Sequence, residues 1–221
     1  MQTNWEIIGR EGINFYGKMS ASISHEIKNI LAIINENAGL LGDFTLMAER
    51  GVRIEPERLK IISAKIAEQV KRADLIVKNM NQFAHSVDEQ IKTVALDDLI
   101  AVVIKLSLRF AANRGVHLEH QPAALPVSIT TSPFLLKNLI WLCLDKAMKI
   151  TGEKKNVSII AKDGQNGVMI NFKHSGILQE ESGTLFPGEQ EKALLTLLGA
   201  EMKINDEAGE LTLHLPASLD Q

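Results

Sequence analysis

Residues 15–34 read FYGKMSASISHEIKNILAII, and their apolar side chains recur every three or four residues. The members of this stripe are Phe15, Met19, Ile23, Ile27, Leu31 and Ile34. Such spacing is typical of one face of an amphipathic α-helix. His25 lies two residues from both Ile23 and Ile27, so it points about 200° away from the stripe. The sequence therefore predicts a long helix that presents an imidazole to solvent.

The residues around His25 form a motif. The stretch Ser24-His25-Glu26-Ile27-Lys28-Asn29 is similar to the phosphoacceptor box of two-component sensor histidine kinases. The usual form of that box is Ser-His-Glu-Leu-Arg/Lys-Thr/Asn-Pro-Leu, and this chain departs from it at Ile30, where the family has proline. Because proline bends a helix, its absence predicts a straighter helix.

A second amphipathic helix is expected after the first. The first helix should run from about Asn14, or from an earlier residue if the preceding glycines are tolerated, to about Glu49. Residues 50–54 break its pattern, and Pro56 suits the first turn of the next helix. The apolar positions of that helix are Leu59, Ile62, Ile66, Val70, Ala73, Val77, Met80 and Ala84. Two such helices cannot bury both stripes between themselves, so we expect a homodimeric four-helix bundle, as the family resemblance also implies. A plain coiled coil without chemistry is the alternative.

Beyond Asp88 the pattern changes to mixed helix and strand. Helices are expected at residues 96–113, 133–150 and 191–198, and strands at 116–120, 127–129, 156–161, 168–172, 201–205 and 210–215. We expect the first two strands to form a pair, and Gln165-Asn166-Gly167 to form a turn. This order resembles the ATP-binding catalytic domain of histidine kinases, an α/β sandwich. The predicted fold is thus α plus α/β, with a dimerisation and phosphoacceptor domain at 1–90 and a degenerate catalytic domain at 91–221.

The nucleotide motifs of that family are altered here. Lys146 stands where the resemblance places a magnesium-ligating asparagine, and an ammonium has no lone pair to give a metal. Lys146 could instead meet a phosphate directly or remain a solvated helix residue. His174 replaces the aspartate that accepts a hydrogen bond from adenine, which weakens nucleotide binding without excluding it.

The third change is a short interval before the helix expected near residue 193. Only residues 187–192 separate Leu185 and Phe186 from Ala193. In an active kinase a mobile lid and a glycine-rich turn occupy this interval and bring backbone N–H groups to the triphosphate. This chain offers Gly188 and two glutamates, which would repel a nucleotide. We therefore do not expect ATP use.

What remains is a phosphoacceptor whose donor is another protein. The resemblance implies a histidine phosphotransferase that exchanges phosphate between receiver domains of response regulators through His25. Glu26 would handle the ring proton, Lys28 would help to neutralise phosphate, and Asn29 could position a water. Asn35, Asn37 and Lys60 are candidates for choosing among receivers. We expect no cofactor in this chain, since magnesium would belong to the receiver.

Three alternatives stay open at this point. The chain could be a sensor-less cytoplasmic histidine kinase, a receiver phosphatase that uses Glu26 and Asn29, or a noncatalytic dimeric adaptor. Composition narrows the partners. A net charge of -3 gives no general attraction to nucleic acid or an acidic membrane. The sequence contains no apolar run near the length needed to cross a bilayer and starts with no signal-peptide pattern, so we expect a cytoplasmic protein.

Overall fold

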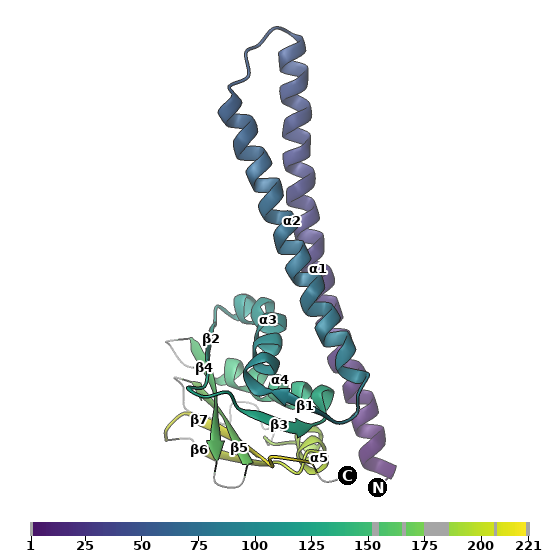
Figure 1. Cartoon of the computed structure of the whole chain (residues 1–221), viewed down its shortest axis with the longest axis vertical. Helices are drawn as coiled ribbons and strands as arrows, with labels where there is room; N and C mark the ends of the chain where they lie inside the picture. Colours follow the sequence, from purple (N-terminus) through teal and green to yellow (C-terminus); the bar gives the residue numbers. More distant parts are fainter. Residues whose placement is uncertain (1, 152–154, 165–166, 175–185, 206, 220–221) are drawn as a thin grey trace. The chain divides into compact units, whose positions relative to one another are not determined.

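The computed structural model describes residues 2–151, 155–164, 167–174, 186–205 and 207–219. The chain forms two compact units, one of residues Ser20–Asn81 and the other of Met1–Met19 together with Gln82–Gln221. Figure 1 shows the order of the elements along the chain. The predicted domain boundary between residues 90 and 91 stays a prediction.

Two long helices form the predicted hairpin. Helix α1 spans Gln2–Glu49 and helix α2 spans Pro56–Ala84. Helix α1 starts well before Asn14, so the glycines at its beginning are accommodated within the helix. It ends where Gly51 adopts a φ of 80°, a conformation that residues other than glycine rarely adopt.

The apolar stripe predicted on α1 divides between two faces. Ile23 is buried and Ile27 is half-buried, whereas Leu31 is 58% exposed. The reason is geometric: each step of four residues advances about 40° around a helix, so a run of such steps winds away from the starting face. Ile30, seven residues after Ile23, is buried instead. Within the single chain the stripe is therefore only partly buried, and Ile30, which the sequence analysis left outside the stripe, belongs to the buried face.

The α/β part of the chain contains a five-stranded sheet in the order β2-β4-β5-β7-β6. Its strands are β2 (His117–Gln121), β4 (Asn156–Gly164), β5 (Gly167–His174), β6 (Glu201–Asn205) and β7 (Glu210–Leu215). The accompanying helices are α3 (Leu96–Arg114), α4 (Pro133–Ile150) and α5 (Glu189–Leu197). Strands β4, β5 and β7 alternate between buried and half-buried residues, as expected of a sheet covered on one face. Helix α4 packs on β4 and β5 and forms the centre of the core (Figure 1).

A small second sheet corrects one prediction. Strands β1 (Lys92–Ala95) and β3 (Ser128–Thr131) pair in antiparallel orientation, whereas β2 pairs in parallel with β4. The two strands expected to pair with each other thus belong to different sheets, because β3 pairs instead with a strand that the sequence analysis missed. The expected turn at residues 165–166 lies outside the described residues, although Gly164 and Gly167 are paired in the flanking strands.

An aromatic cluster joins the ends of the two long helices to α4. The ring centroids of Phe15 and Phe83 lie 5.3 Å apart in an edge-to-face arrangement, and Phe134 lies 5.7 Å from Phe15. Gly12 belongs to the same contact, because a Cβ there would lie 3.3 Å from the Phe134 ring. We call Gly12, Phe15, Phe83 and Phe134 the base clamp. Phe15 and Phe83 are buried, and each buried ring of this kind contributes about 2 kcal/mol of hydrophobic stabilisation.

A buried lysine lies beside the base clamp. Lys137 of α4 is only 6% exposed, and its ammonium donates one long hydrogen bond of 3.4 Å to the carbonyl oxygen of Gln82. Burial lowers the pKa of Lys137 from 10.5 to about 8. Below pH 8 the side chain is protonated in both the folded and the unfolded chain, so the folded state bears the full cost of burying the charge.

Replacement of Lys137 by methionine should therefore stabilise the fold. Between pH 8 and 10.5 only the unfolded chain holds the proton, so the free energy of unfolding of the natural protein should rise with pH. We expect Lys137→Met to add about 2 kcal/mol at pH 7 and to remove this rise. Urea unfolding at pH 7 and pH 10 measures both effects, with the exposed Lys105→Met as control. Equal pH dependence in the two variants would contradict the assignment.

Candidate functional site

The predicted phosphoacceptor is accessible. His25, Lys28 and Asn29 are exposed on α1, whereas Glu26 is half-buried. Asn29 follows His25 by one turn, about 40° around the helix, so the two side chains share a face. His25 lies about 140° from Ile30, which marks the buried face of α1. The His25 imidazole and the Asn29 carboxamide can therefore be reached by a partner molecule without any change in the packing of α1.

Nothing within the described parts of the chain engages the His25 ring. Among those residues neither the His25 nor the Asn29 side chain forms a hydrogen bond or an ion pair, and no hydrogen bond joins Glu26 to the imidazole. The imidazole is thus available as a nucleophile, while the proton-handling role predicted for Glu26 requires its side chain to turn toward the ring. The roles predicted for His25, Glu26, Lys28 and Asn29 stay predictions.

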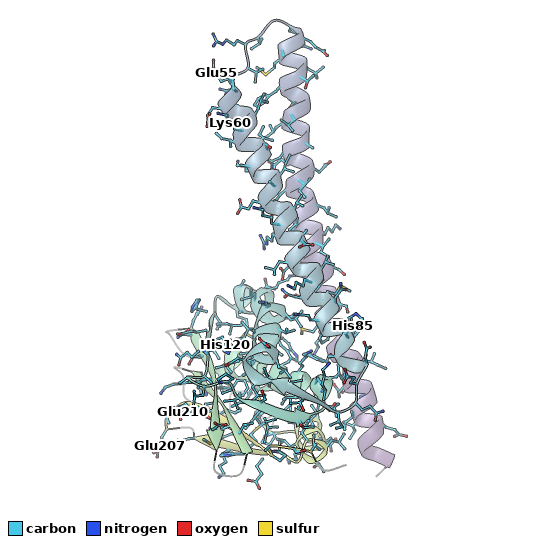
Figure 2. All side chains as sticks on the ribbon, in the orientation of Figure 1. Glu55, Lys60, His85, His120, Glu207 and Glu210 are labelled. Carbon is cyan, nitrogen blue, oxygen red and sulfur yellow. The ribbon has the colours of Figure 1, made fainter. Side chains whose placement is uncertain are left out.

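Asn37, one of the residues proposed to choose among receivers, is buried and cannot contact a partner in this conformation. Asn37 is only 5% exposed, and its side-chain amide donates a hydrogen bond of 2.7 Å to the carbonyl oxygen of Ile33. The sequence held a signal for this position, since Asn37 follows the buried Ile30 by seven residues and shares its face. Asn35 is exposed, and Lys60 is exposed near the start of α2, where it pairs with Glu57 at 3.3 Å (Figure 2).

The second candidate site lies where α4 meets the segment before α5. Lys146 is half-buried, and its ammonium lies 5.6 Å from the centroid of the Phe186 ring. At that distance a cation is attracted by the face of an aromatic ring. Lys146, which the sequence analysis placed where the family has a magnesium-ligating asparagine, thus holds its ammonium beside an aromatic ring. Phe186 had been given no role in the sequence analysis.

The first turn of α5 uses its own carboxylate as a cap. The backbone N–H of Gly188 donates to the Glu191 side chain at 2.9 Å. A helix N-terminus exposes unpaired N–H groups and a partial positive charge that would otherwise attract a phosphate. Burial raises the pKa of the Cys143 thiol well above its usual range, and the nearby Glu191 charge adds to this shift. Glu191 therefore brings negative charge close to α4.

His174 ends strand β5 as a buried residue. It is 4% exposed, and its backbone N–H donates to the carbonyl oxygen of Gly209 at 2.9 Å. Residues 175–185, which follow His174 and include Leu185, lie outside the described parts of the chain. The structure thus places His174 on the packed face of the sheet, paired at Cα with Val157.

An ion-pair network on α4 was missed by the sequence analysis. Asp145 binds Arg114 and Lys149, each at 2.7 Å. The spacing of Asp145 and Lys149 by four residues on a helix was a usable signal, whereas Arg114 comes from another helix and could not be assigned from local sequence. The network neighbours Lys146 in sequence and fixes the last turns of α4.

Among solved structures, the chain is similar to the catalytic domain of the histidine kinase ThkA. The TM-score is 0.50 at 14% sequence identity, over 60% of this chain and 100% of that domain. Lower scores are found for the Acinetobacter baumannii histidine kinase AdeS (0.48, 12% identity, 87% of this chain and 98% of that one). The ATP-binding domain of PrrB from Mycobacterium tuberculosis scores 0.47, with 19% identity over 58% of this chain and 98% of that domain.

The sequence comparisons find no relative. No protein-family model matches the chain, and no curated protein matches it. No helix in the described ranges is long and apolar enough to cross a membrane. The likeness to ThkA therefore rests on structure, and it shows that the α/β part of this chain has the fold of a histidine kinase catalytic domain.

Proposed function

We propose that this chain is a histidine phosphotransferase of a phosphorelay. It takes a phosphoryl group from the phosphoaspartate of one response-regulator receiver domain onto His25 and passes it to the aspartate of another. The observation that carries the proposal is the exposed, unengaged His25 in a chain that also has the fold of a kinase catalytic domain. The protein would act in the cytoplasm, with receivers as partners and without binding nucleic acid or a membrane.

The chemistry is nucleophilic catalysis through a phosphoimidazole. A ring nitrogen of neutral His25 attacks phosphorus, the N–P bond forms, and the bond from phosphorus to the aspartyl oxygen breaks to release a carboxylate. The ring then carries a positive charge, which the carboxylate of Glu26 can stabilise while it holds the remaining ring proton. Attack by the second receiver's aspartate breaks the N–P bond and returns the electron pair to the imidazole.

Positioning and charge neutralisation provide most of the catalysis in such a transfer. Lys28 lies on the exposed side of α1 and can approach a phosphoryl oxygen. We expect magnesium to come with the receiver, so this chain would need no cofactor of its own.

The α/β domain supports a role without ATP. Lys146 cannot ligate magnesium, and its ammonium already lies beside Phe186. At the start of α5 the Glu191 carboxylate accepts the hydrogen bond of the Gly188 N–H, and its negative charge would repel a triphosphate. Both contacts engage groups on which the resemblance would place a nucleotide's metal and phosphates, and they therefore support the proposal.

A homodimer is part of the proposal. Besides the face that α1 and α2 bury against each other, both helices carry a second apolar stripe that is open in the single chain. On α1 it includes Leu31, and on α2 it includes Leu59, Val70 and Val77, which are 41–58% exposed. A second copy would cover this stripe and complete a four-helix bundle.

A receiver phosphatase is the second candidate function. Asn29 shares the exposed face of His25, so its amide could orient a water toward a receiver's phosphoaspartate. This route would remove phosphate from the receiver without phosphorylating His25, and time courses separate the two functions. The noncatalytic adaptor would take no label from a receiver, whereas the kinase would be recognised by labelling of His25 from ATP.

Replacement of the phosphoacceptor tests the proposal. Incubation with a receiver domain that carries a labelled phosphoaspartate, here called the labelled phosphoreceiver, should label the natural chain. His25→Gln should lower that label at least 100-fold because glutamine has no nucleophilic ring nitrogen. His85→Gln is the matched control, since His85 is also an exposed histidine, with a 75% exposed side chain (Figure 2). Light scattering should show the same oligomeric state for both variants.

Other outcomes of this experiment identify the alternatives. Equal label in His25→Gln and the natural chain would contradict phosphotransfer through His25. Loss of receiver phosphate without label on the natural chain, abolished by Asn29→Ala, would favour the phosphatase. No change in the receiver's phosphate would favour the adaptor.

The second apolar stripe gives a separate prediction for the dimer. Val70→Lys should raise the dimer dissociation constant at least tenfold, because it would place an ammonium inside the proposed bundle. Leu75→Lys is the matched control: Leu75 is on the same helix and similarly exposed (50% against 53%), but lies about 140° around it. Sedimentation equilibrium measures both constants. Equal effects of the two variants, or a monomeric natural chain, would contradict the bundle.

A further inference from the structure

The base clamp binds three helical segments that are far apart in the sequence. Phe15 comes from α1, Phe83 from the last turn of α2, and Phe134 from the first turn of α4. All of them lie in the unit formed by Met1–Met19 and Gln82–Gln221. The ends of the two long helices therefore belong to the same packed body as the α/β core.

The clamp has the features of a permanent contact. Phe83 is 1% exposed and meets three other rings, including that of Tyr16, which stacks on it at 5.4 Å. At Gly12 the close approach of the Phe134 ring leaves no room for a larger side chain unless the ring moves. Closely packed rings lose these contacts together when they separate, so the cluster favours one arrangement.

Polar contacts fasten the same junction. The Lys137 ammonium donates to the carbonyl oxygen of Gln82, and the Ser86 hydroxyl donates to that of Phe83. Both carbonyls belong to the last turn of α2, whose oxygens lack partners within the helix. The attraction between a positive charge and the helix C-terminus offsets only part of the cost of burying the Lys137 ammonium. The end of α2 is thus satisfied by groups from α4 and from the residue that follows the helix.

The segment that connects α2 to the α/β domain would restrain that domain only weakly without the base clamp. In the 3₁₀ turn η1 (His85–Val87) the His85 ring is hydrogen-bonded to Asp88 at 2.7 Å, and after the turn Lys92 forms an ion pair with Glu89 at 2.7 Å. All four side chains are more than half exposed, and exposed pairs of this kind contribute little. The aromatic cluster, rather than this connection, therefore restrains the α/β domain.

We propose that the base clamp makes the α/β domain an immobile support for the ends of the long helices, rather than a catalytic arm that moves. This inference rests on the proposed function. A domain that phosphorylates a histidine with its own ATP has to bring the nucleotide to within about 3.5 Å of the ring and release it afterwards, which requires freedom to move. A chain that receives its phosphate from a separate protein needs no such motion, and a fixed domain costs it nothing in catalysis.

Spin-label distances test the clamp directly in the full-length chain. Labels at Lys18→Cys and Lys105→Cys report on the beginning of α1 and on α3, both in the unit that contains the clamp; the native Cys143 is buried. Pulsed electron spin resonance should give one narrow distance distribution. Phe134→Ala should broaden it at least twofold, whereas Phe110→Ala, which removes a comparable contact with Trp141 at 4.7 Å, should leave it narrow.

The outcomes separate the clamp from the phosphotransfer. A broad distribution in the unmutated clamp, or an unchanged one in Phe134→Ala, would overturn the proposal. If Phe134→Ala fails to fold, Gly12→Val tests the same contact by wedging the ring, and the same broadening is expected. The distance measurement needs no phosphate donor, so it is independent of the phosphotransfer assay. The clamp proposal can therefore be contradicted while His25 still transfers phosphate, and phosphotransfer can be contradicted while the distance distribution stays narrow.

Discussion

The candidate site depends on one constraint: two apolar faces of helix α1 leave only one side of the helix for exposed polar residues. One face of α1 buries Ile23 and Ile30, and a second apolar stripe remains open at Leu31. His25 can be exposed only because it lies opposite both of them, about 140° from Ile30 and about 120° from Leu31. A shift of two residues in this pattern would bury the imidazole, so the packing of the hairpin and the chemistry of His25 are set by the same spacing.

The α/β domain has a known architecture, but its chemistry has to be argued from its own residues. Its sheet and helices have the fold of a kinase catalytic domain, but a fold does not determine an activity. The Lys146 ammonium lies beside the Phe186 ring, and the Glu191 carboxylate caps the first turn of α5. Under the proposal made above, the task of the domain is mechanical, since α4 contributes Phe134 to the base clamp at the ends of the long helices.

Elements set by local periodicity were predicted well. Helix α4 and strands β6 and β7 have the predicted bounds, and the exposure of His25 follows from two-residue offsets. Features that depend on distant partners were missed, since nothing near Thr130 indicates pairing with β1, and nothing near Phe134 indicates contact with Phe15. Asn37 was misplaced because a polar residue was taken to be exposed, although its seven-residue spacing from Ile30 indicated otherwise.

The source of the phosphoryl group is the central claim, and a comparison of two donors tests it most directly. The natural chain would be incubated in parallel with labelled ATP and magnesium and with a labelled phosphoreceiver, and acid-labile, base-stable label on His25 would be followed over time. The account predicts rapid, reversible label from the receiver and none from ATP. Robust labelling of His25 by ATP would contradict it.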